Sequence, residues 1–193
     1  MRLFAAAELD DTVRNRAAAV SATLRAAAVA DGRRAVSWVA PENLHITLRF
    51  IGDTDEATAE RIVGQLVRPL DLPAFEVSIA GAGSFPPSGP PRVVWLGVGD
   101  GGVELAAVAR EVNRRLEAIG LPREDRPFRA HLTIGRVKAP TGPRFREALS
   151  AARNVAVGRC IVRGVTLFES RLSSSGSTYS VVATSPLGYH RTP

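Results

Sequence analysis

Apolar and polar residues follow two different periods along the 193 residues of this chain. A period of two marks strands with one buried face, and a period near 3.6 marks amphipathic helices. The first period predicts strands at 2–9, 36–39, 44–51, 74–81, 92–98, 129–137 and 155–168, and a terminal hairpin with its turn at Ser173–Gly176. The second period predicts helices from Asp10 or Asp11 to about Ala30, from Asp53 or Thr54 to about Leu70, at 102–119 and at 143–152. A Pro/Gly-rich loop is expected from Gly83 to Pro91.

Two of the three histidines begin the same short motif, His-x-Thr-x, at two distant points of the chain. The copies are His45-Ile46-Thr47-Leu48 and His131-Leu132-Thr133-Ile134. Both lie in predicted strands, where side chains alternate between two faces, so His and Thr share one face and the apolar residues share the other. The order of elements also hints at two similar halves, each with a helix before its motif strand. A pseudo-twofold axis between such halves would make the two His/Thr pairs face each other.

The paired motifs favour acid–base chemistry on a phosphodiester. The unperturbed pKa of histidine lies near neutrality, so one imidazole can take a proton from water while the other gives one to the leaving oxygen. Threonine hydroxyls and an arginine can hold the remaining phosphate oxygens. Strict alternation puts Arg49 and Arg129 on the same face as the neighbouring motif. It puts Arg136 on the opposite face, unless a bulge at Gly135 turns Arg136 inward.

A metal site is disfavoured, because neither motif has a carboxylate within two residues. No cofactor is expected. Cys160 lies in an apolar segment and is expected to be a buried structural thiol. Trp38 and Trp95 are expected in the core or in a cleft wall, with stacking on a nucleobase as the alternative. His190, in a polar C-terminal segment, is expected to have no role.

The composition indicates which broad class of protein the chain belongs to. The hydrophobic fraction of 45% fits a soluble globular protein. No apolar run is long enough to cross a bilayer, and the first residues suit a strand better than a signal peptide, so a cytoplasmic location without membrane contact is expected. The net charge is +6, and Lys138 is the one lysine among 25 basic residues. Such arginine richness suits a nucleic-acid substrate, although a compositional bias explains it equally well. More specific is a cluster near the second motif, formed by Arg123, Arg126, Arg129 and Arg136.

Several longer segments around the motifs form a recognisable set. They are Met1–Ala6, Trp38–Gly52, Gly83–Phe85, Val94–Val98, Phe128–Arg136 and Leu167–Leu172. In the same order and over almost the whole chain, they resemble the RNA 2′,3′-cyclic phosphodiesterases, two-histidine phosphoesterases once called 2′-5′ RNA ligases. This resemblance implies an α+β fold in which residues 1–193 form one domain of two pseudo-symmetric lobes. Antiparallel sheets would flank a central cleft, with helices on the outside.

The same resemblance implies hydrolysis of RNA 2′,3′-cyclic phosphate ends to 2′-phosphomonoesters without a metal. His45 would be the general acid and His131 the general base. Thr47, Thr133 and Arg136 would bind the phosphate. Ala130 departs from the proline that commonly precedes the second histidine, which affects loop stiffness more than chemistry.

Other functions stay open at this point. The same site can run in reverse and join RNA through a 2′-5′ linkage, or act on another cyclic or linear phosphodiester, such as a 2′-5′ oligoadenylate or ADP-ribose 1″,2″-cyclic phosphate. A non-enzymatic RNA-end binding module is a further alternative, although recognition alone needs no paired acid and base. The expected partner is RNA with a 2′,3′-cyclic phosphate end, for example a tRNA fragment, or a small cyclic nucleotide. The protein is expected to be a monomer.

Overall fold

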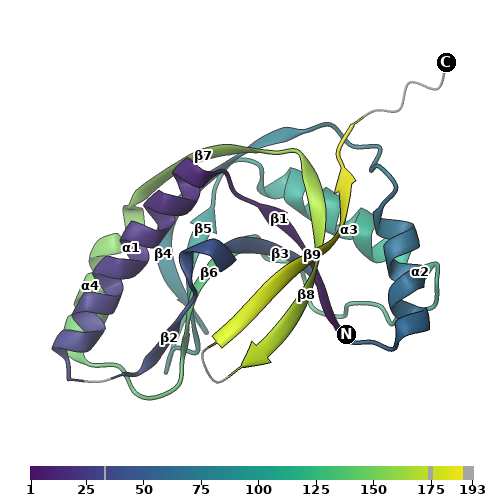
Figure 1. Ribbon diagram of the computed structural model, residues 1–193. Helices are drawn as coiled ribbons and strands as arrows, with labels where there is room; N and C mark the ends of the chain where they lie inside the picture. Colours follow the sequence, from purple (N-terminus) through teal and green to yellow (C-terminus); the bar gives the residue numbers. More distant parts are fainter. Residues whose placement is uncertain (33, 174–175, 189–193) are drawn as a thin grey trace.

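The computed structural model describes residues 1–32, 34–173 and 176–188, which form two antiparallel sheets with helices outside them (Figure 1). Sheet A has the strand order β3 (His45–Asp53), β1 (Arg2–Glu8), β8 (Gly164–Ser173) and β9 (Gly176–Pro186). Sheet B has the order β2 (Val36–Trp38), β6 (His131–Val137), β5 (Val93–Val98), β4 (Phe75–Phe85) and β7 (Ala156–Val162). The helices are α1 (Asp11–Ala30), α2 (Glu56–Leu66), α3 (Gly102–Glu117) and α4 (Pro143–Ala151), with short 3-10 turns at Pro41–Asn43 and Ala152–Asn154. The expected α+β class is confirmed.

Each sheet is covered by its own pair of helices, which makes the molecule bilobal. Helices α1 and α4 pack on sheet B, and α2 and α3 pack on sheet A. The two pairs lie at opposite ends of the molecule in Figure 1. The lobes do not coincide with the two halves of the sequence, because sheet A combines β1 and β3 with the C-terminal strands β8 and β9.

The segments β1–α1–β3 and β5–α3–β6 repeat one arrangement. In each, a strand pairs antiparallel with a motif strand that follows the helix in the chain. The helix between them crosses to the other lobe, so that α1 packs against β6 and α3 packs against β3. This reciprocal crossing brings β3 and β6 into contact where the two sheets meet. The two motif strands therefore lie together although they belong to different sheets.

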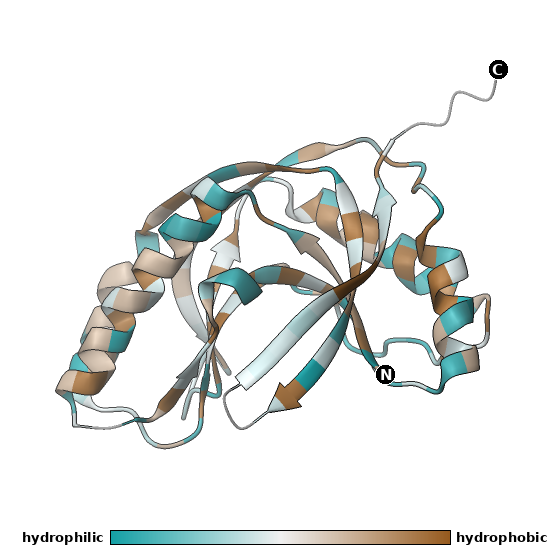
Figure 2. Cartoon of the chain, in the orientation of Figure 1, coloured by the Kyte–Doolittle hydropathy of each residue, from teal (hydrophilic) through white to brown (hydrophobic). Residues whose placement is uncertain are grey.

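One apolar cluster joins both sheets and the helices of the described part. Apolar and polar residues alternate along the helices in Figure 2, as expected for helices with one side on a sheet. Asp10 and Asp55 cap α1 and α2, because their carboxylates accept hydrogen bonds from the backbone N–H groups of Val13 (2.8 Å) and Thr58 (2.7 Å). Within the described residues, no helix is both long and apolar enough to cross a membrane.

A smaller apolar cluster lies on the other face of sheet A. It consists of Phe4, Ala6 and Phe168, with Tyr179 packed against it. Phe4 and Ala6 alternate along β1 with residues of the main core, so the two clusters lie on opposite faces of the sheet. This second face carries the first motif histidine.

The structure corrects the extent of several predicted elements. The segment 155–168 is not one strand, because β7 ends at Val162 in sheet B and β8 begins at Gly164 in sheet A. Strand β4 continues to Phe85, so the Pro/Gly-rich loop begins after it and not at Gly83. The terminal hairpin is confirmed by the pairing of Ser173 with Gly176, and the two residues between them lie outside the described part.

Candidate active site

The two motif histidines are held in the same way. Each is the first residue of its strand, and each ring Nδ1 contacts a backbone carbonyl oxygen shortly before it in the chain. The distance is 2.7 Å from His45 Nδ1 to Asn43 O, and 2.6 Å from His131 Nδ1 to Arg129 O. Because a carbonyl oxygen only accepts, Nδ1 carries the proton in both rings. Nε2 is therefore the nitrogen that each neutral ring leaves available for proton transfer.

The threonines share the face of their histidines. Thr47 Oγ1 lies 3.1 Å from His45 Nε2, close enough for the hydroxyl to donate a hydrogen bond to the ring. Thr133, like Thr47, is half-buried, and it pairs with Trp95 of β5. The apolar residues of both motifs are buried on the opposite face, as the alternation predicted; they are Ile46, Leu48, Leu132 and Ile134.

Both motif strands contain a β-bulge at the same position. In β3 the pairing with β1 skips Leu48, and in β6 the pairing with β5 skips Ile134. An extra residue shifts the alternation by one. The residue after each bulge therefore stays on the buried face, and the next residue turns to the face of the motif.

The bulge in β6 brings Arg136 to the motif face, which is the arrangement that Gly135 was expected to permit. Gly135 is needed there, because a Cβ at this position would lie only 2.8 Å from Val36 Cγ1 of the neighbouring strand. Arg136 is exposed, and its positive charge is one of the causes that lower the pKa of His45. Arg136 thus lies near the histidine of the other lobe.

The bulge in β3 makes the prediction for Arg49 wrong. Arg49 turns to the buried face and is 8% exposed. Its Nη2 donates to Pro122 O at 2.6 Å, and its Nη1 lies 3.3 Å from Glu124 Oε2. Arg49 therefore ties β3 to the loop that leads into β6. Phe50 takes the position on the motif face and is 45% exposed.

Arg129 is not part of the predicted strand, because β6 begins at His131 and leaves Arg129 in the preceding loop; its side chain nevertheless lines the same cleft as His131. Its carbonyl oxygen is the group that orients His131. Its guanidinium lies over the ring of Phe85, 5.9 Å from the centroid. Phe85 in turn contacts His131 edge-on, with ring centroids 5.2 Å apart.

His45 is enclosed by aromatic rings. Phe4 stacks on it at 4.8 Å, and Tyr179 meets it edge-on at 5.4 Å. Burial lowers the pKa of His45 below its usual value of 6.5. The hydrogen bond to Asn43 and the negative charge of Glu8 oppose this, while Arg136 adds to it. Glu8 is placed by the pairing of β1 with β3, directly opposite His45.

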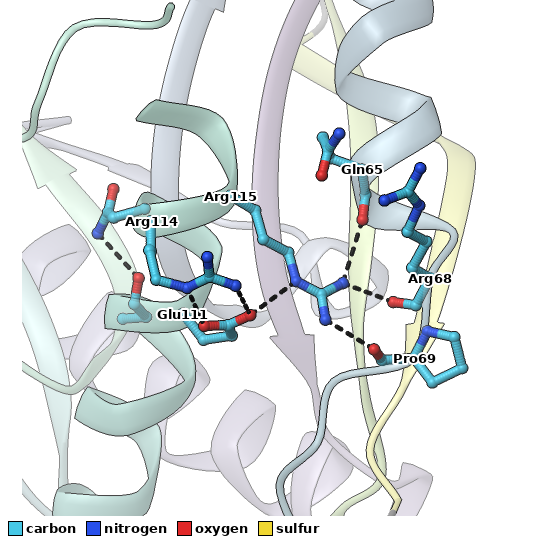
Figure 3. A network of polar contacts seen from close by, with 8 residues as sticks. Gln65, Arg68, Pro69, Glu111, Arg114 and Arg115 are labelled. Carbon is cyan, nitrogen blue, oxygen red and sulfur yellow. Dashed lines mark hydrogen bonds and ion pairs between the residues drawn. The ribbon is translucent and has the colours of Figure 1, made fainter. Parts of the chain in front are cut away.

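A cleft of about 1400 Å³ opens beside the second motif, and its lining includes Thr47, Phe50, Phe85 and His131. Another part of its wall is formed by α3 and the chain after α2. Figure 3 shows how this wall is built: Arg115 of α3 reaches across to the carbonyl oxygens of Gln65, Arg68 and Pro69, and it pairs with Glu111 of its own helix. Arg115 therefore fixes this part of the cleft wall.

The remaining candidates have structural surroundings. Cys160 is buried, and burial raises the pKa of its thiol. Trp38 packs against Phe145 at 6.3 Å. Trp95 packs against Phe85 at 5.2 Å, and it pairs with Thr133 on the motif face of sheet B. His190 lies outside the described residues, among which no cluster of three or more His, Cys, Asp or Glu side chains could hold a metal ion.

Several contributors were not found by sequence reasoning. The carbonyl oxygens of Asn43 and Arg129 leave no signal in side-chain identity, although both residues precede their histidine by the same interval. Glu8 and Phe85 come from strands distant in sequence, and only the pairing of β1 with β3 and of β4 with β5 brings them to the site. Phe50 faces the site only because of the bulge at Leu48.

A family model described as the 2′-5′ RNA ligase superfamily matches residues 10–173. The chain belongs to this superfamily. Two similar members, named RNA 2′,3′-cyclic phosphodiesterase, come from Archaeoglobus fulgidus and Aquifex aeolicus. The first is 38% identical over 179 residues, covering 93% of this chain and 96% of that protein. The second is 36% identical and covers 78% of this chain and 81% of that protein.

Solved structures with the same fold match almost the whole chain. TT0787 of Thermus thermophilus aligns with a TM-score of 0.74 at 28% identity, covering 96% of this chain and 97% of that one. E. coli LigT complexed with 3′-AMP aligns with a TM-score of 0.67 at 23% identity, with the same coverage of 96% and 97%. The expected bilobal fold of the superfamily is thereby confirmed.

Proposed function

We propose that this protein hydrolyses RNA 2′,3′-cyclic phosphate ends to 2′-phosphomonoesters, without a metal ion. The observation that carries this proposal is the matched pair of histidines, each with Nδ1 bound to a backbone carbonyl and Nε2 left for proton transfer. The names of the similar superfamily members support the substrate class. The side chains present support the absence of a metal, because the described residues form no metal-ligand cluster.

In this mechanism His131 is the general base and His45 the general acid. His131 Nε2 takes a proton from water as the water oxygen attacks phosphorus. The bond between phosphorus and the ribose O3′ breaks, and His45 Nε2–H gives its proton to O3′. The phosphate stays on O2′. Thr47, Thr133 and Arg136 hold the other phosphate oxygens, where developing negative charge is stabilised by donors already in place.

The acid role requires a protonated His45, whereas burial lowers the pKa of its ring in the free protein. The substrate itself provides the opposing effect, because a phosphate anion beside the ring favours the charged form. Glu8, opposite His45, acts in the same direction. The hydrogen bond from Nδ1 to Asn43 O also strengthens when the ring is charged.

The direct test is the identity of the product. We expect a 2′,3′-cyclic mononucleotide to give the 2′-monophosphate alone, at a rate that excess EDTA does not change. Liquid chromatography against both monophosphate standards distinguishes the products. Formation of the 3′-monophosphate would contradict the assigned leaving group, and binding without turnover would favour the RNA-end binding module.

The titration of His45 provides a second test. Because Glu8 raises its pKa and Arg136 lowers it, Glu8→Gln should move the His45 titration to lower pH and Arg136→Gln should move it to higher pH. NMR titration of the ring carbon protons in the free protein reports this directly. One limb of the pH profile of kcat/KM should move in the same direction as the NMR value. Shifts of the same sign in both variants would contradict the placement of the two charges around His45.

A further inference from the structure

Asn43 makes two hydrogen bonds that link the proposed general acid, His45, to a distant strand. Its backbone oxygen accepts from His45 Nδ1 at 2.7 Å, and its side-chain Nδ2 donates to the backbone oxygen of Ser177 at 2.7 Å. Asn43 and Ser177 are 134 residues apart in the chain. One residue therefore connects the ring of His45 to β9, the outer strand of sheet A.

Asn43 lies in a short segment that crosses between the two sheets. It ends the 3-10 turn Pro41–Asn43, which follows β2 of sheet B and precedes β3 of sheet A. Within the turn, the backbone N–H of Asn43 donates to Ala40 O at 2.9 Å. This local bond fixes the shape of the turn and contributes nothing to its position against β9. The hydrogen bond from the Asn43 amide to Ser177 O supplies that position.

Strand β9 is suited to this task because it lies at the end of sheet A. Ser177 pairs with Leu172 of β8, and one edge of β9 faces away from β8. Backbone groups on the free edge of an outer strand take partners from outside the sheet. Two residues further along β9, Tyr179 meets the ring of His45 edge-on at 5.4 Å. The same strand thus holds His45 from two directions, through the ring of Tyr179 and through Asn43.

The position of the Asn43 carbonyl matters because the two ring nitrogens of His45 have different tasks. While Nδ1–H is held by Asn43 O, Nε2 lies 3.1 Å from Thr47 Oγ1, where the proposed mechanism places the phosphate. The hydrogen bond at one ring nitrogen sets which nitrogen carries the proton of the neutral ring. A displaced carbonyl would release this choice and let the ring rotate. A catalytic group misplaced by about 1 Å can cost about 10²-fold in rate.

We propose that Asn43 is a positioning residue for the general acid, and that its hydrogen bond to Ser177 O holds the carbonyl that fixes the tautomer and the direction of the His45 ring. The inference rests on the proposed function, in which His45 is the acid. Asn43 touches no reacting atom in this arrangement and acts through His45. The hairpin of β8 and β9 thereby becomes part of the support of the catalytic site.

Two substitutions remove the amide donor in different ways. Asn43→Ala deletes it, and Asn43→Asp replaces it with a carboxylate of the same size, which can only accept and therefore repels Ser177 O. Both should lower kcat for a 2′,3′-cyclic mononucleotide by about 10–100-fold and leave KM within about twofold, because the ring is misdirected while the groups that hold the phosphate stay in place. Thermal unfolding checks that the variants are folded. Asn43→Asp, which keeps the size of the side chain, carries the test if Asn43→Ala does not fold.

Asn154 provides a matched control. It also ends a 3-10 turn, Ala152–Asn154, that leads into a strand, but this strand is β7, which carries no motif. Asn154 is exposed. Asn154→Ala should leave kcat within about twofold of wild type. A loss equal to that of Asn43→Ala would overturn the role of Asn43.

The tautomer of His45 is a readout that a merely structural role would not change. Nitrogen–proton NMR of the imidazole rings in the free protein should show both neutral rings of the wild type protonated on Nδ1. Either Asn43 variant should convert His45 to a mixture of the two neutral tautomers. His131 should keep its tautomer in the same spectra, because its Nδ1 is held by Arg129 O.

The titration of His45 separates orientation from charge. The hydrogen bond to Asn43 raises the pKa of His45, so its weakening in Asn43→Ala should move the titration to lower pH. The added carboxylate of Asn43→Asp should move it to higher pH. A loss of kcat in both variants despite opposite shifts of the pKa upholds orientation as the cause. A loss in Asn43→Ala alone would show that charge is the cause, and would overturn the positioning role.

The NMR measurement also separates this inference from the proposed function, because it needs no turnover. A mixed His45 tautomer in the variants upholds the role of Asn43 in orienting the ring even if the wild type hydrolyses no cyclic nucleotide. Hydrolysis by the wild type, with an unchanged tautomer and unchanged kcat in both variants, overturns the role of Asn43 and leaves the proposed function standing.

Discussion

We expect His45→Ala and His131→Ala each to lower kcat/KM for a 2′,3′-cyclic nucleotide by about 10²–10⁴-fold while the protein stays folded. Each change removes the one nitrogen, Nε2, that the site leaves for proton transfer. The measurement is steady-state hydrolysis, with circular dichroism and thermal unfolding to confirm the fold.

Asparagine variants make this test sharper than alanine variants. In His131→Asn the side-chain amide N–H can keep the hydrogen bond to Arg129 O, while nothing remains at the position of Nε2. His45→Asn does the same toward Asn43 O. If the histidines served only to hold the loops in place and not to transfer protons, the asparagine variants would keep much of the activity that the alanine variants lose. Substantial activity in either alanine variant would sink the proposed mechanism.

Two further variants complete the comparison. His190→Ala is the matched control, because His190 is the third histidine of the chain and lacks the motif. It should retain full activity. In His45→Ala/His131→Ala the two losses should not multiply, because an acid and a base that act in one step form a unit.

How far sequence alone predicts this site is shown by the two motif strands. Alternation with a period of two placed His45 with Thr47 and His131 with Thr133, because the first three residues of each motif lie before the bulge. Beyond that point the same rule failed for Arg49. A bulge adds only one residue to a strand, and whether it forms depends on how the partner strand pairs. The local sequence therefore indicates a bulge only where a glycine such as Gly135 is present.

The parts of the fold that could not be predicted from the sequence also depend on strand pairing. Helix and strand types followed from the period of the apolar residues, and the half repeat was visible in the order of elements. The assignment of strands to sheets was not visible, because it depends on pairings such as β1 with β8, whose partners lie at opposite ends of the chain. The change of sheet between β7 and β8 occurs at the single residue Arg163, inside what reads as one apolar segment. Contacts of such long sequence separation carry no local pattern.

We expect Arg115→Met to lower the free energy of unfolding by about 3 kcal/mol. The substitution removes a nearly buried guanidinium and leaves the several polar groups that bind it without a partner. Arg115 is 11% exposed, and its guanidinium lies 2.8 Å from Glu111 Oε1. It also donates to the backbone carbonyl oxygens of Gln65, Arg68 and Pro69 (Figure 3). Urea unfolding at neutral pH measures the loss.

The neighbouring Arg114 provides a matched control, since it pairs with the same Glu111 from a position that is 69% exposed. Arg114→Met should cost under about 1 kcal/mol, as exposed ion pairs usually do. The hydrogen bond from Arg114, opposed by burial and reinforced by Arg115, lowers the pKa of Glu111 from 4.5 to about 2. A lowered pKa means that this contribution to stability is complete above about pH 4.5 and is lost as the pH falls toward 2. Equal losses of unfolding free energy in the two variants would show that the ion pair with Glu111 contributes to stability and that the contacts to α2 do not. A larger loss in Arg115→Met instead shows that this arginine stabilises the contacts to α2, and with them this part of the cleft wall.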